Sequence, residues 1–195
     1  GQLYGSWSYE LINFIEPSVP IHEIQKNEIP HGSWMFFDQI IVFDQMKRCL
    51  TALIYADLKQ FKDLPIDDIY EKSIHQIQSI KNLMRTPLNN VDILKWQQKK
   101  DLNLDISSNW TQDEFQKVVL QAKEFIKKGD IFQIVISQKF KTEVKSKPFD
   151  LYRSLRMTNP SPYMAYFDFG SWFLIGSSPE VMVKAERKKN KQIVA

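Results

Sequence analysis

The sequence predicts an α+β fold in which antiparallel strands pack against helices. The first third of the chain is rich in the aromatic and β-branched residues that favour strands. A long segment in the middle carries apolar residues at spacings of three and four, which places them on one face of a helix. Beyond it, a capping sequence opens a second helix, and strands and a further helix follow. Helices that alternate with antiparallel strands are typical of a layered α+β domain.

Three strands are expected near the N-terminus, at Leu3–Ile15, Trp34–Phe43 and Cys49–Tyr55. The last two are separated by the segment 44–47, whose length suits a hairpin, although it lacks the Asn-Gly or Asp-Gly pair that favours a tight turn. These segments predict an antiparallel sheet as the first part of the fold.

The amphipathic helix is expected at Ile66–Met84, and Pro87 prevents its continuation. Residues 86–109 then mix Asn, Asp, Lys and Gln with few apolar positions, a composition typical of a connection between structural units. We therefore expect a first domain at residues 1–108 and a second at residues 109–195.

In the second domain, Thr111 and Glu114 are expected to form a capping box, and Gly129 to supply the left-handed residue that ends the helix after Lys128. The remaining predicted elements are a strand at Ile131–Phe140, a helix at Phe149–Met157, and two strands around Gly170, at Tyr163–Phe169 and Ser171–Ile175.

The end of the chain resembles the opening of another strand. Residues 192–195 are expected to begin a strand that pairs with Val181–Val183, and a sheet that stopped there would leave edge groups unpaired. We therefore expect further sequence beyond Ala195.

Composition limits the class of protein. The 195 residues are 43% hydrophobic and 13% aromatic, enough for a soluble globular protein with a sizeable core. A net charge of +3, from 26 basic and 23 acidic residues, argues against a nucleic-acid surface, and the basic run Lys184–Lys191 is interpreted as a solvated turn between two strands. No apolar run approaches the about 18 residues that cross a membrane, so we expect a cytoplasmic protein, or one of the plastid stroma.

Residue spacing alone indicates no chemistry. Cys49 is the single cysteine, so no intrachain disulfide can form. The three histidines are scattered, and none stands at metal-ligand spacing from another or from the cysteine. The sequence also lacks a glycine-rich phosphate loop and a nucleophile elbow.

Two stretches change this interpretation. Residues 129–138, Gly-Asp-Ile-Phe-Gln-Ile-Val-Ile-Ser-Gln, resemble the Gly-Asp-Ile-Phe-Gln-Val-Val-Leu-Ser-Gln run of the chorismate-utilising enzymes. Residues 159–164, Asn-Pro-Ser-Pro-Tyr-Met, and 176–180, Gly-Ser-Ser-Pro-Glu, are similar to the anthranilate synthase branch of that family. The resemblance implies the N-terminal part of the family's two-lobed α+β sandwich, with antiparallel sheets, packed helices and an incomplete second lobe. Residues 1–108 would belong to the N-terminal domain, and residues 109–195 would begin the chorismate-binding catalytic domain.

Gln133 is the most informative residue of this resemblance. The matching position is a lysine in the isochorismate and salicylate synthases of the family, where it is taken to activate water, and a glutamine in the ammonia-using members. A neutral amide can hold ammonia through hydrogen bonds but cannot act as a base. The resemblance therefore implies an amination. Without it, a glutamine paired to backbone or solvent is the more common interpretation.

Glu180 matches the family's glutamate that protonates the departing ring hydroxyl as a general acid. A carboxyl donates a proton near neutral pH only if desolvation or nearby negative charge raises its pKa, and the two carboxylates of chorismate would supply such charge. On the sequence alone, an exposed turn glutamate is the simpler interpretation.

A third set of residues matches a segment that contributes to the feedback tryptophan site of the family. Two prolines stiffen this segment, while a tyrosine and a methionine offer apolar surface to an indole. A rigid connector between a helix and a strand is the simpler interpretation. The residues are Asn159, Pro160, Pro162, Tyr163 and Met164.

The resemblance implies that the complete enzyme binds chorismate and Mg²⁺, whose ligands are expected beyond the end of this chain. Ammonia from a partner glutaminase subunit adds at C2 while the C4 hydroxyl leaves, and elimination of pyruvate gives anthranilate. Two alternatives stay open: the aminodeoxychorismate synthase of the para-aminobenzoate branch, which also carries glutamine at the Gln133 position, and a catalytically silent scaffold domain. Because several active-site motifs of the family are expected after Ala195, this chain alone is expected to be inactive.

Overall fold

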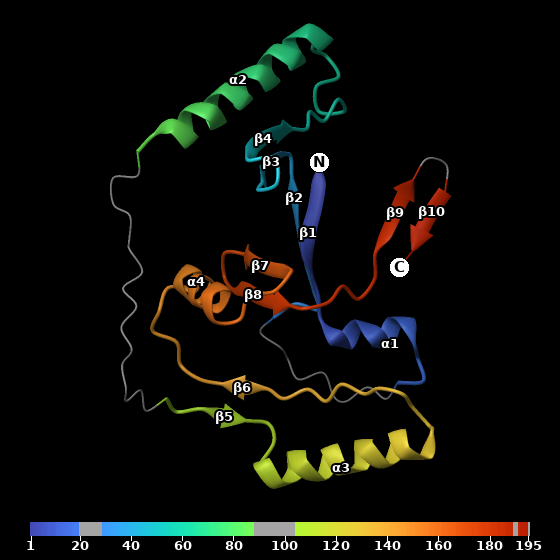
Figure 1. The fold of residues 1–195 in the computed structure, drawn as a ribbon. Coiled ribbons are helices and arrows are strands. Elements are labelled where there is room, and N and C mark those ends of the chain that lie inside the picture. Colours follow the sequence, from blue (N-terminus) through green and yellow to red (C-terminus); the bar gives the residue numbers. More distant parts are fainter. Residues whose placement is uncertain (20–28, 88–103, 189–190, 195) are drawn as a thin grey trace. The chain divides into compact units, whose positions relative to one another are not determined.

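The computed structural model describes residues 1–19, 29–87, 104–188 and 191–194 (Figure 1). It divides into two compact units, one of residues 1–93 with 151–195 and the other of residues 94–150. Within the described residues, the strands form five two-stranded sheets, and every pair is antiparallel. The predicted α+β class, with antiparallel sheets and helices, is confirmed.

The first strand is shorter than predicted. β1 (Gln2–Trp7) pairs with β2 (Gly32–Phe37), but the chain then turns into a 3₁₀ helix, η1 (Tyr9–Leu11), and a short helix, α1 (Ile12–Ile15), so the second half of the predicted strand is wrong. The change of direction begins at Ser8, whose backbone N–H donates to the carbonyl of His31 at 2.7 Å. Beyond this residue the apolar side chains are helically spaced, and aromatic and β-branched content alone does not separate the two periods.

The predicted hairpin is present. β3 (Gln39–Asp44) and β4 (Cys49–Ile54) pair antiparallel, with Asp44 opposite Cys49. The expected strand Trp34–Phe43 is interrupted at Asp38, where the carbonyl accepts the N–H of Tyr55 at 2.8 Å and separates β2 from β3.

Helix α2 (Ile66–Arg85) confirms the amphipathic segment. It packs on β4, and Ile69 is buried in its first half. The helix ends at Thr86, whose extended backbone (φ −70°, ψ 125°) is the conformation favoured before a proline. The predicted connection that follows lies mostly outside the described residues, since residues 88–103 are not among them.

The second unit contains helix α3 (Gln112–Lys128) and two short strands, β5 (Ser107–Ser108) and β6 (Phe140–Lys141). The predicted capping box is present: the Thr111 hydroxyl accepts the Glu114 N–H at 3.3 Å, and the Glu114 carboxylate accepts the Thr111 N–H at 2.9 Å. Gly129 ends the helix with φ 82°, as predicted.

The strand predicted at Ile131–Phe140 is wrong over most of its length, because only Phe140 of that range belongs to a ladder. β5 offers only two residues for pairing. A segment rich in apolar, β-branched residues forms no strand unless the backbone groups of a partner strand are available to it. The last residues of the segment are instead tied to the loop after β5. Asn109 exchanges two hydrogen bonds with Lys139, at 2.7 and 3.1 Å, and the Trp110 indole N–H donates to the Ser137 carbonyl at 3.2 Å.

The last part of the first unit begins with helix α4 (Pro148–Thr158), which confirms the predicted helix within one residue at either end. The hairpin of β7 (Tyr163–Asp168) and β8 (Phe173–Ser178) turns at Gly170, with φ 84°. Helix α4 contacts one face of this hairpin, where the ring centroids of Tyr152 and Tyr166 are 5.8 Å apart.

A further hairpin corrects two predictions at the end of the chain. β9 (Ala185–Lys188) pairs with β10 (Lys191–Val194), so Val181–Val183 is not the partner strand, and the basic run lies largely within the two strands. Two strands separated by two residues can pair directly as a hairpin. The predicted pairing with Val181–Val183 would have required a longer loop.

Few side chains are buried. Among the described residues, only Ile69 and Ala122 have less than a tenth of their surface exposed. The expected sizeable core is therefore absent from the described residues, because two-stranded sheets that contact single helices leave many apolar faces uncovered. None of the helices in the described part of the chain is long and apolar enough to cross a membrane.

Candidate active-site segments

The structure places the two predicted catalytic residues in different units. Gln133 lies in the second unit, between α3 and β6, and Glu180 lies in the first unit, two residues after β8. Both side chains are exposed. That the Gln133 amide and the Glu180 carboxyl face each other across one pocket stays a prediction.

The C-terminal end of α3 determines how the chain enters the segment around Gln133. The N–H of Gly129 donates to the Ile126 carbonyl and the N–H of Asp130 to the Phe125 carbonyl, each at 3.1 Å. These bonds, with the left-handed Gly129, turn the chain out of the helix four residues before the glutamine. Gln133 thus lies outside the helix, and its exposed side-chain amide carries both a hydrogen-bond donor and an acceptor.

The five predicted tryptophan-site residues lie together in the first unit. They follow α4, whose last turn is closed by the Asn159 N–H donating to the Leu155 carbonyl at 2.8 Å. We call residues 159–162 the proline loop and residues 177–180 the glutamate segment. The loop leads into β7 and the glutamate segment leaves β8, so both lie at the same end of the hairpin, where Tyr163 is paired with Ser178.

The proline loop and the glutamate segment are joined by serine side chains. The Ser177 hydroxyl donates to the Asn159 carbonyl at 2.6 Å, and the Ser161 hydroxyl donates to the Ser178 carbonyl at 2.8 Å. The Ser178 hydroxyl donates to the Glu180 carbonyl at 3.0 Å. The sequence motifs indicate roles for the residues around these serines but not for the serines themselves. For Ser161 and Ser178 the available signal was a position beside prolines, which cannot donate backbone hydrogen bonds, whereas Ser177 has no such signal.

Two ionisable groups beside this hairpin have shifted pKa values. The pKa of Lys184 is raised, first by its hydrogen bond to Glu186, whose carboxylate lies 2.6 Å from the ammonium nitrogen, and in smaller part by Tyr163. Desolvation, followed by the charge of Asp168, raises the pKa of the Tyr166 phenol. A cation therefore lies near the residue that begins β7.

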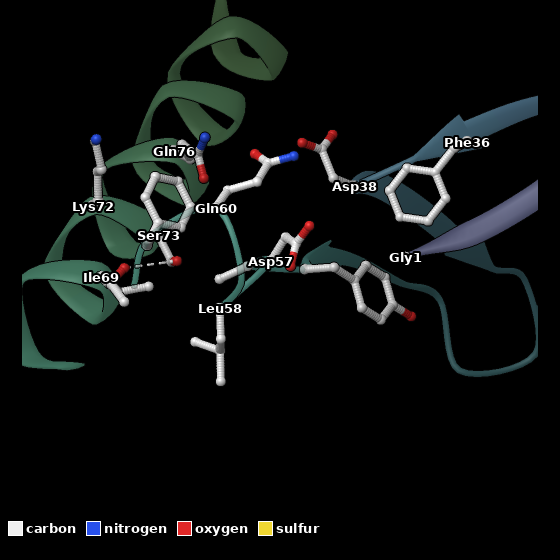
Figure 2. A pocket seen from close by; sticks show the side chains of 13 residues that line it. Gly1, Phe36, Asp38, Asp57, Leu58, Gln60, Ile69, Lys72, Ser73 and Gln76 are labelled. Carbon is white, nitrogen blue, oxygen red and sulfur yellow. Dashed lines mark hydrogen bonds between the residues drawn. The ribbon is translucent and has the colours of Figure 1, made fainter. Parts of the chain in front are cut away.

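A pocket of about 540 Å³ in the first unit contains none of the predicted site residues. It lies between α2 and the segment around Tyr55, and the Lys72 ammonium nitrogen lies 5.1 Å from the centre of the Phe61 ring at its edge. Figure 2 shows the Gln60 amide and the Asp38 carboxylate directed toward each other. Most of its polar lining is solvent-exposed, so we assign it no chemistry.

A divalent-cation site is not formed by the part of the chain that the structure describes. No three His, Cys, Asp or Glu side chains gather there in a way that could hold a metal ion. Carboxylate oxygens are the ligands that magnesium prefers, and the described residues offer no cluster of three such side chains for the implied Mg²⁺.

Comparison with known proteins places these segments in a family. The family described as chorismate binding enzyme matches residues 1–195. Anthranilate synthase component 1 of Synechocystis sp. is 42% identical over 199 residues, which cover 100% of this chain and 39% of that protein. The component 1 of Acetivibrio thermocellus is 35% identical over 191 residues, covering 95% and 37% of the two chains.

The fold leads to the same group. The crystal structure of anthranilate synthase component I from Streptococcus pneumoniae TIGR4 matches with a TM-score of 0.68 and 32% identity, covering 95% of this chain and 40% of that one. The chain thus spans about two fifths of the length of these relatives. Since the family match extends over every residue, the chain belongs to the chorismate binding enzymes.

Proposed function

We propose that this chain is part of an anthranilate synthase component 1, a lyase that makes anthranilate from chorismate in tryptophan biosynthesis. The observation that carries the proposal is the similarity, over the whole chain, to proteins with that name at up to 42% identity. The aminodeoxychorismate synthase alternative is not favoured, because the similar proteins named above are anthranilate synthases.

The proposed reaction replaces the C4 hydroxyl of chorismate by an amine at C2. The nitrogen lone pair of ammonia forms the new bond to C2, and both ring double bonds shift by one position toward C4. The C4 hydroxyl leaves as water after it has gained a proton, and the new C–N group loses one to become the amine. Loss of a ring proton and of the enolpyruvyl group, which departs as pyruvate, then gives the aromatic ring of anthranilate.

Gln133 and Glu180 are the residues of this chain that we assign to the first step. The Gln133 amide would hold ammonia by hydrogen bonds without removing a proton from water, which favours amination over hydration. The Glu180 carboxyl would protonate the leaving hydroxyl. Its exposure in this structure means that the substrate and the rest of the enzyme would have to exclude water from it.

The proline loop and the start of β7 would form part of a feedback site for tryptophan. Two prolines fix the loop, and Tyr163 and Met164 offer the apolar surface that an indole needs. Under this proposal, the serine hydrogen bonds between this loop and the glutamate segment would join a regulatory element to a catalytic one.

Partners and compartment follow from the same proposal. A glutaminase subunit would supply ammonia, and Mg²⁺ would be held by residues outside this chain, so no step is assigned to magnesium here. The chain alone would be inactive, with residues 1–108 as part of the N-terminal domain and residues 109–195 as the start of the catalytic domain. The compartment would be the cytoplasm, or the plastid stroma, as the names of the chloroplastic alpha subunits of Arabidopsis thaliana suggest.

The test is an assay of the full-length protein that contains this chain. With chorismate, an ammonium salt and magnesium, we expect anthranilate and pyruvate in equal amounts, followed by anthranilate fluorescence and by product chromatography. A para-substituted amino product would identify the aminodeoxychorismate branch. A folded protein that leaves chorismate unchanged with ammonia, and with a glutaminase partner and glutamine, would support the scaffold alternative.

A further inference from the structure

Two serine hydroxyls clasp the proline loop to the glutamate segment in opposite directions. Ser177 donates from the glutamate segment to the carbonyl of Asn159, and Ser161 donates from the loop to the carbonyl of Ser178, at 2.6 and 2.8 Å. Each segment therefore gives one hydrogen bond and accepts one. Ser161 and Ser177 are both partly buried residues.

The prolines explain why side chains make these bonds. Pro160 and Pro162 stand before β7, and Pro179 follows β8, so none of the three can donate a backbone hydrogen bond where the ladder would otherwise continue. The last pair of the ladder is Tyr163 with Ser178. Beyond it, the Ser161 hydroxyl from the loop and the Ser177 hydroxyl from within the ladder donate the hydrogen bonds that join the two segments.

The clasp extends to the backbone of Glu180. The Ser178 hydroxyl donates to the Glu180 carbonyl at 3.0 Å, and the carbonyl of the same serine accepts from Ser161. The position of Glu180 is thus connected through one residue to the proline loop, and through Asn159 to the end of α4.

We propose that Ser161 and Ser177 are positioning residues, which fix the place of Glu180 relative to the proline loop so that a ligand bound at the loop shifts the glutamate. This inference rests on the proposed function. It assigns a regulatory connection to two hydroxyls that would not themselves touch the reacting atoms.

A purely structural role would give a different result. If the serines only stabilise the hairpin, their loss lowers the free energy of unfolding and leaves the turnover of the folded enzyme unchanged. If they position Glu180, the folded enzyme keeps its affinity for chorismate and loses turnover, because an acid that is misplaced weakens the transition state rather than substrate binding.

The kinetic test uses the full-length protein with Ser161→Ala and Ser177→Ala, and with Ser171→Ala as the matched control. Ser171 lies in the turn at the other end of the same hairpin, is exposed, and makes no side-chain hydrogen bond among the described residues. We expect kcat to fall about threefold to tenfold in the two test variants, with KM for chorismate changed less than about twofold. Ser161→Thr and Ser177→Thr, which keep the hydroxyl, should recover most of the loss.

The second measurement does not depend on catalysis. Amide hydrogen exchange at Ser178 and Glu180 should be about fivefold faster in the two alanine variants than in Ser171→Ala. In the parent protein, tryptophan should slow exchange in the proline loop and at Glu180, while in the double variant Ser161→Ala, Ser177→Ala it should slow exchange in the loop only.

The outcomes separate this inference from the proposed function. If the parent protein makes anthranilate but the test variants match Ser171→Ala in kcat and in exchange, the clasp is overturned and the function stands. If the parent protein makes no anthranilate, the function fails, and exchange at Ser178 and Glu180 without ligand decides the clasp alone. Threonine variants as impaired as the alanine variants would also overturn it.

Discussion

Met164 lies directly opposite Ser177 in the β7–β8 ladder, so the two side chains project from the same face of the hairpin. Tyr166, two residues further along β7, projects from that face as well and contacts Tyr152 of α4. Tyr163 therefore belongs to the opposite face, together with Gly176, where an added Cβ would meet no atom within 4 Å. The two apolar residues assigned to the tryptophan site thus divide between a covered face and an open one.

This division predicts unequal effects of the two side chains on tryptophan inhibition. Tyr163→Ala should raise the half-inhibitory tryptophan concentration about tenfold or more, because it removes aromatic surface from the open face. Met164→Ala should chiefly lower the thermal midpoint, since its side chain is half-buried on the side of α4. Inhibition curves and thermal unfolding of the full-length variants check this. A larger change of inhibition in the methionine variant would reverse the assignment of faces.

Gln133→Lys should change which nucleophile attacks the ring. A protonated lysine cannot accept a hydrogen bond from ammonia, and the neutral amine can act as a base toward water, so anthranilate formation should fall at least about tenfold while a hydroxylated ring product appears. Product chromatography of the full-length variant measures both. Gln116→Lys, the same substitution at an exposed position of α3, is the control and should leave the products unchanged. Unchanged anthranilate output from Gln133→Lys would remove the role of this residue.

Glu180→Gln should abolish proton donation while keeping the size of the side chain. Loss of a positioned general acid lowers turnover by about 10²- to 10⁴-fold. Because the amide preserves shape, chorismate should still bind, which intrinsic fluorescence titration can follow. Glu143→Gln removes an exposed carboxylate of the same type and should retain parental kcat. A Glu180→Gln enzyme with parental kcat would show that another group supplies the proton.

The capping box of α3 should be sensitive to pH. The backbone N–H of Thr111, and then its hydroxyl, lower the pKa of Glu114 below the ordinary value of 4.5. A lowered folded-state pKa means that the carboxylate's contribution to stability is complete above pH 4.5 and is lost as the pH falls through the lower folded-state value. Thr111→Ala should cost about 1 kcal/mol near neutral pH.

The corresponding measurement is amide exchange in the first turn of α3. The difference in protection between Thr111→Ala and the parent should shrink as the pH is lowered below 4.5. Thr142→Ala, outside the helices, is the control and should leave protection in α3 unchanged. A difference that is constant with pH would mean that Glu114 contributes nothing through its charge.

The β3–β4 turn contains a strained residue that can be relieved. Arg48 has φ 52°, a left-handed conformation that costs a residue with a Cβ about 1 kcal/mol. Arg48→Gly should therefore raise the free energy of unfolding by up to about 1 kcal/mol, measured by denaturant titration. The gain is reduced by the larger conformational entropy that a glycine gives to the unfolded chain. Lys47→Gly should lower it instead, because φ at that position is not left-handed. Equal effects of both substitutions would show that strain at Arg48 is not the cause.

The sequence correctly predicted those parts of the fold that depend on interactions between residues close together in the chain. Thr111, Glu114 and Gly129 fixed both ends of α3, because their bonds are made within a few residues of chain. The stop of α2 before Pro87 and the turn at Gly170 have equally local causes. The prediction of a strand at Ile131–Phe140 was wrong because a strand depends on its partner. The partner here is two residues long, and the sequence of residues 131–140 carries no information about that length.

The candidate site, too, was predictable in part from the sequence and in part only from the folded structure. The resemblance supplied Gln133, Glu180 and the proline-loop residues, but only coordinates showed that the loop and the glutamate segment exchange hydrogen bonds through Ser161 and Ser177. Those bonds link residues 17 and 18 positions apart in the chain, and they depend on the β7–β8 register, which a sequence pattern does not fix by itself.

The scarcity of buried side chains has a thermodynamic consequence. All-or-none unfolding arises when many elements share one interior, and among the described residues only Ile69 and Ala122 are enclosed. When this polypeptide is heated by itself, its hairpins and helices should each lose structure at a different temperature. The calorimetric unfolding peak should therefore be broad. Helix α3, which carries its own stop signals at both ends, should be the last to melt.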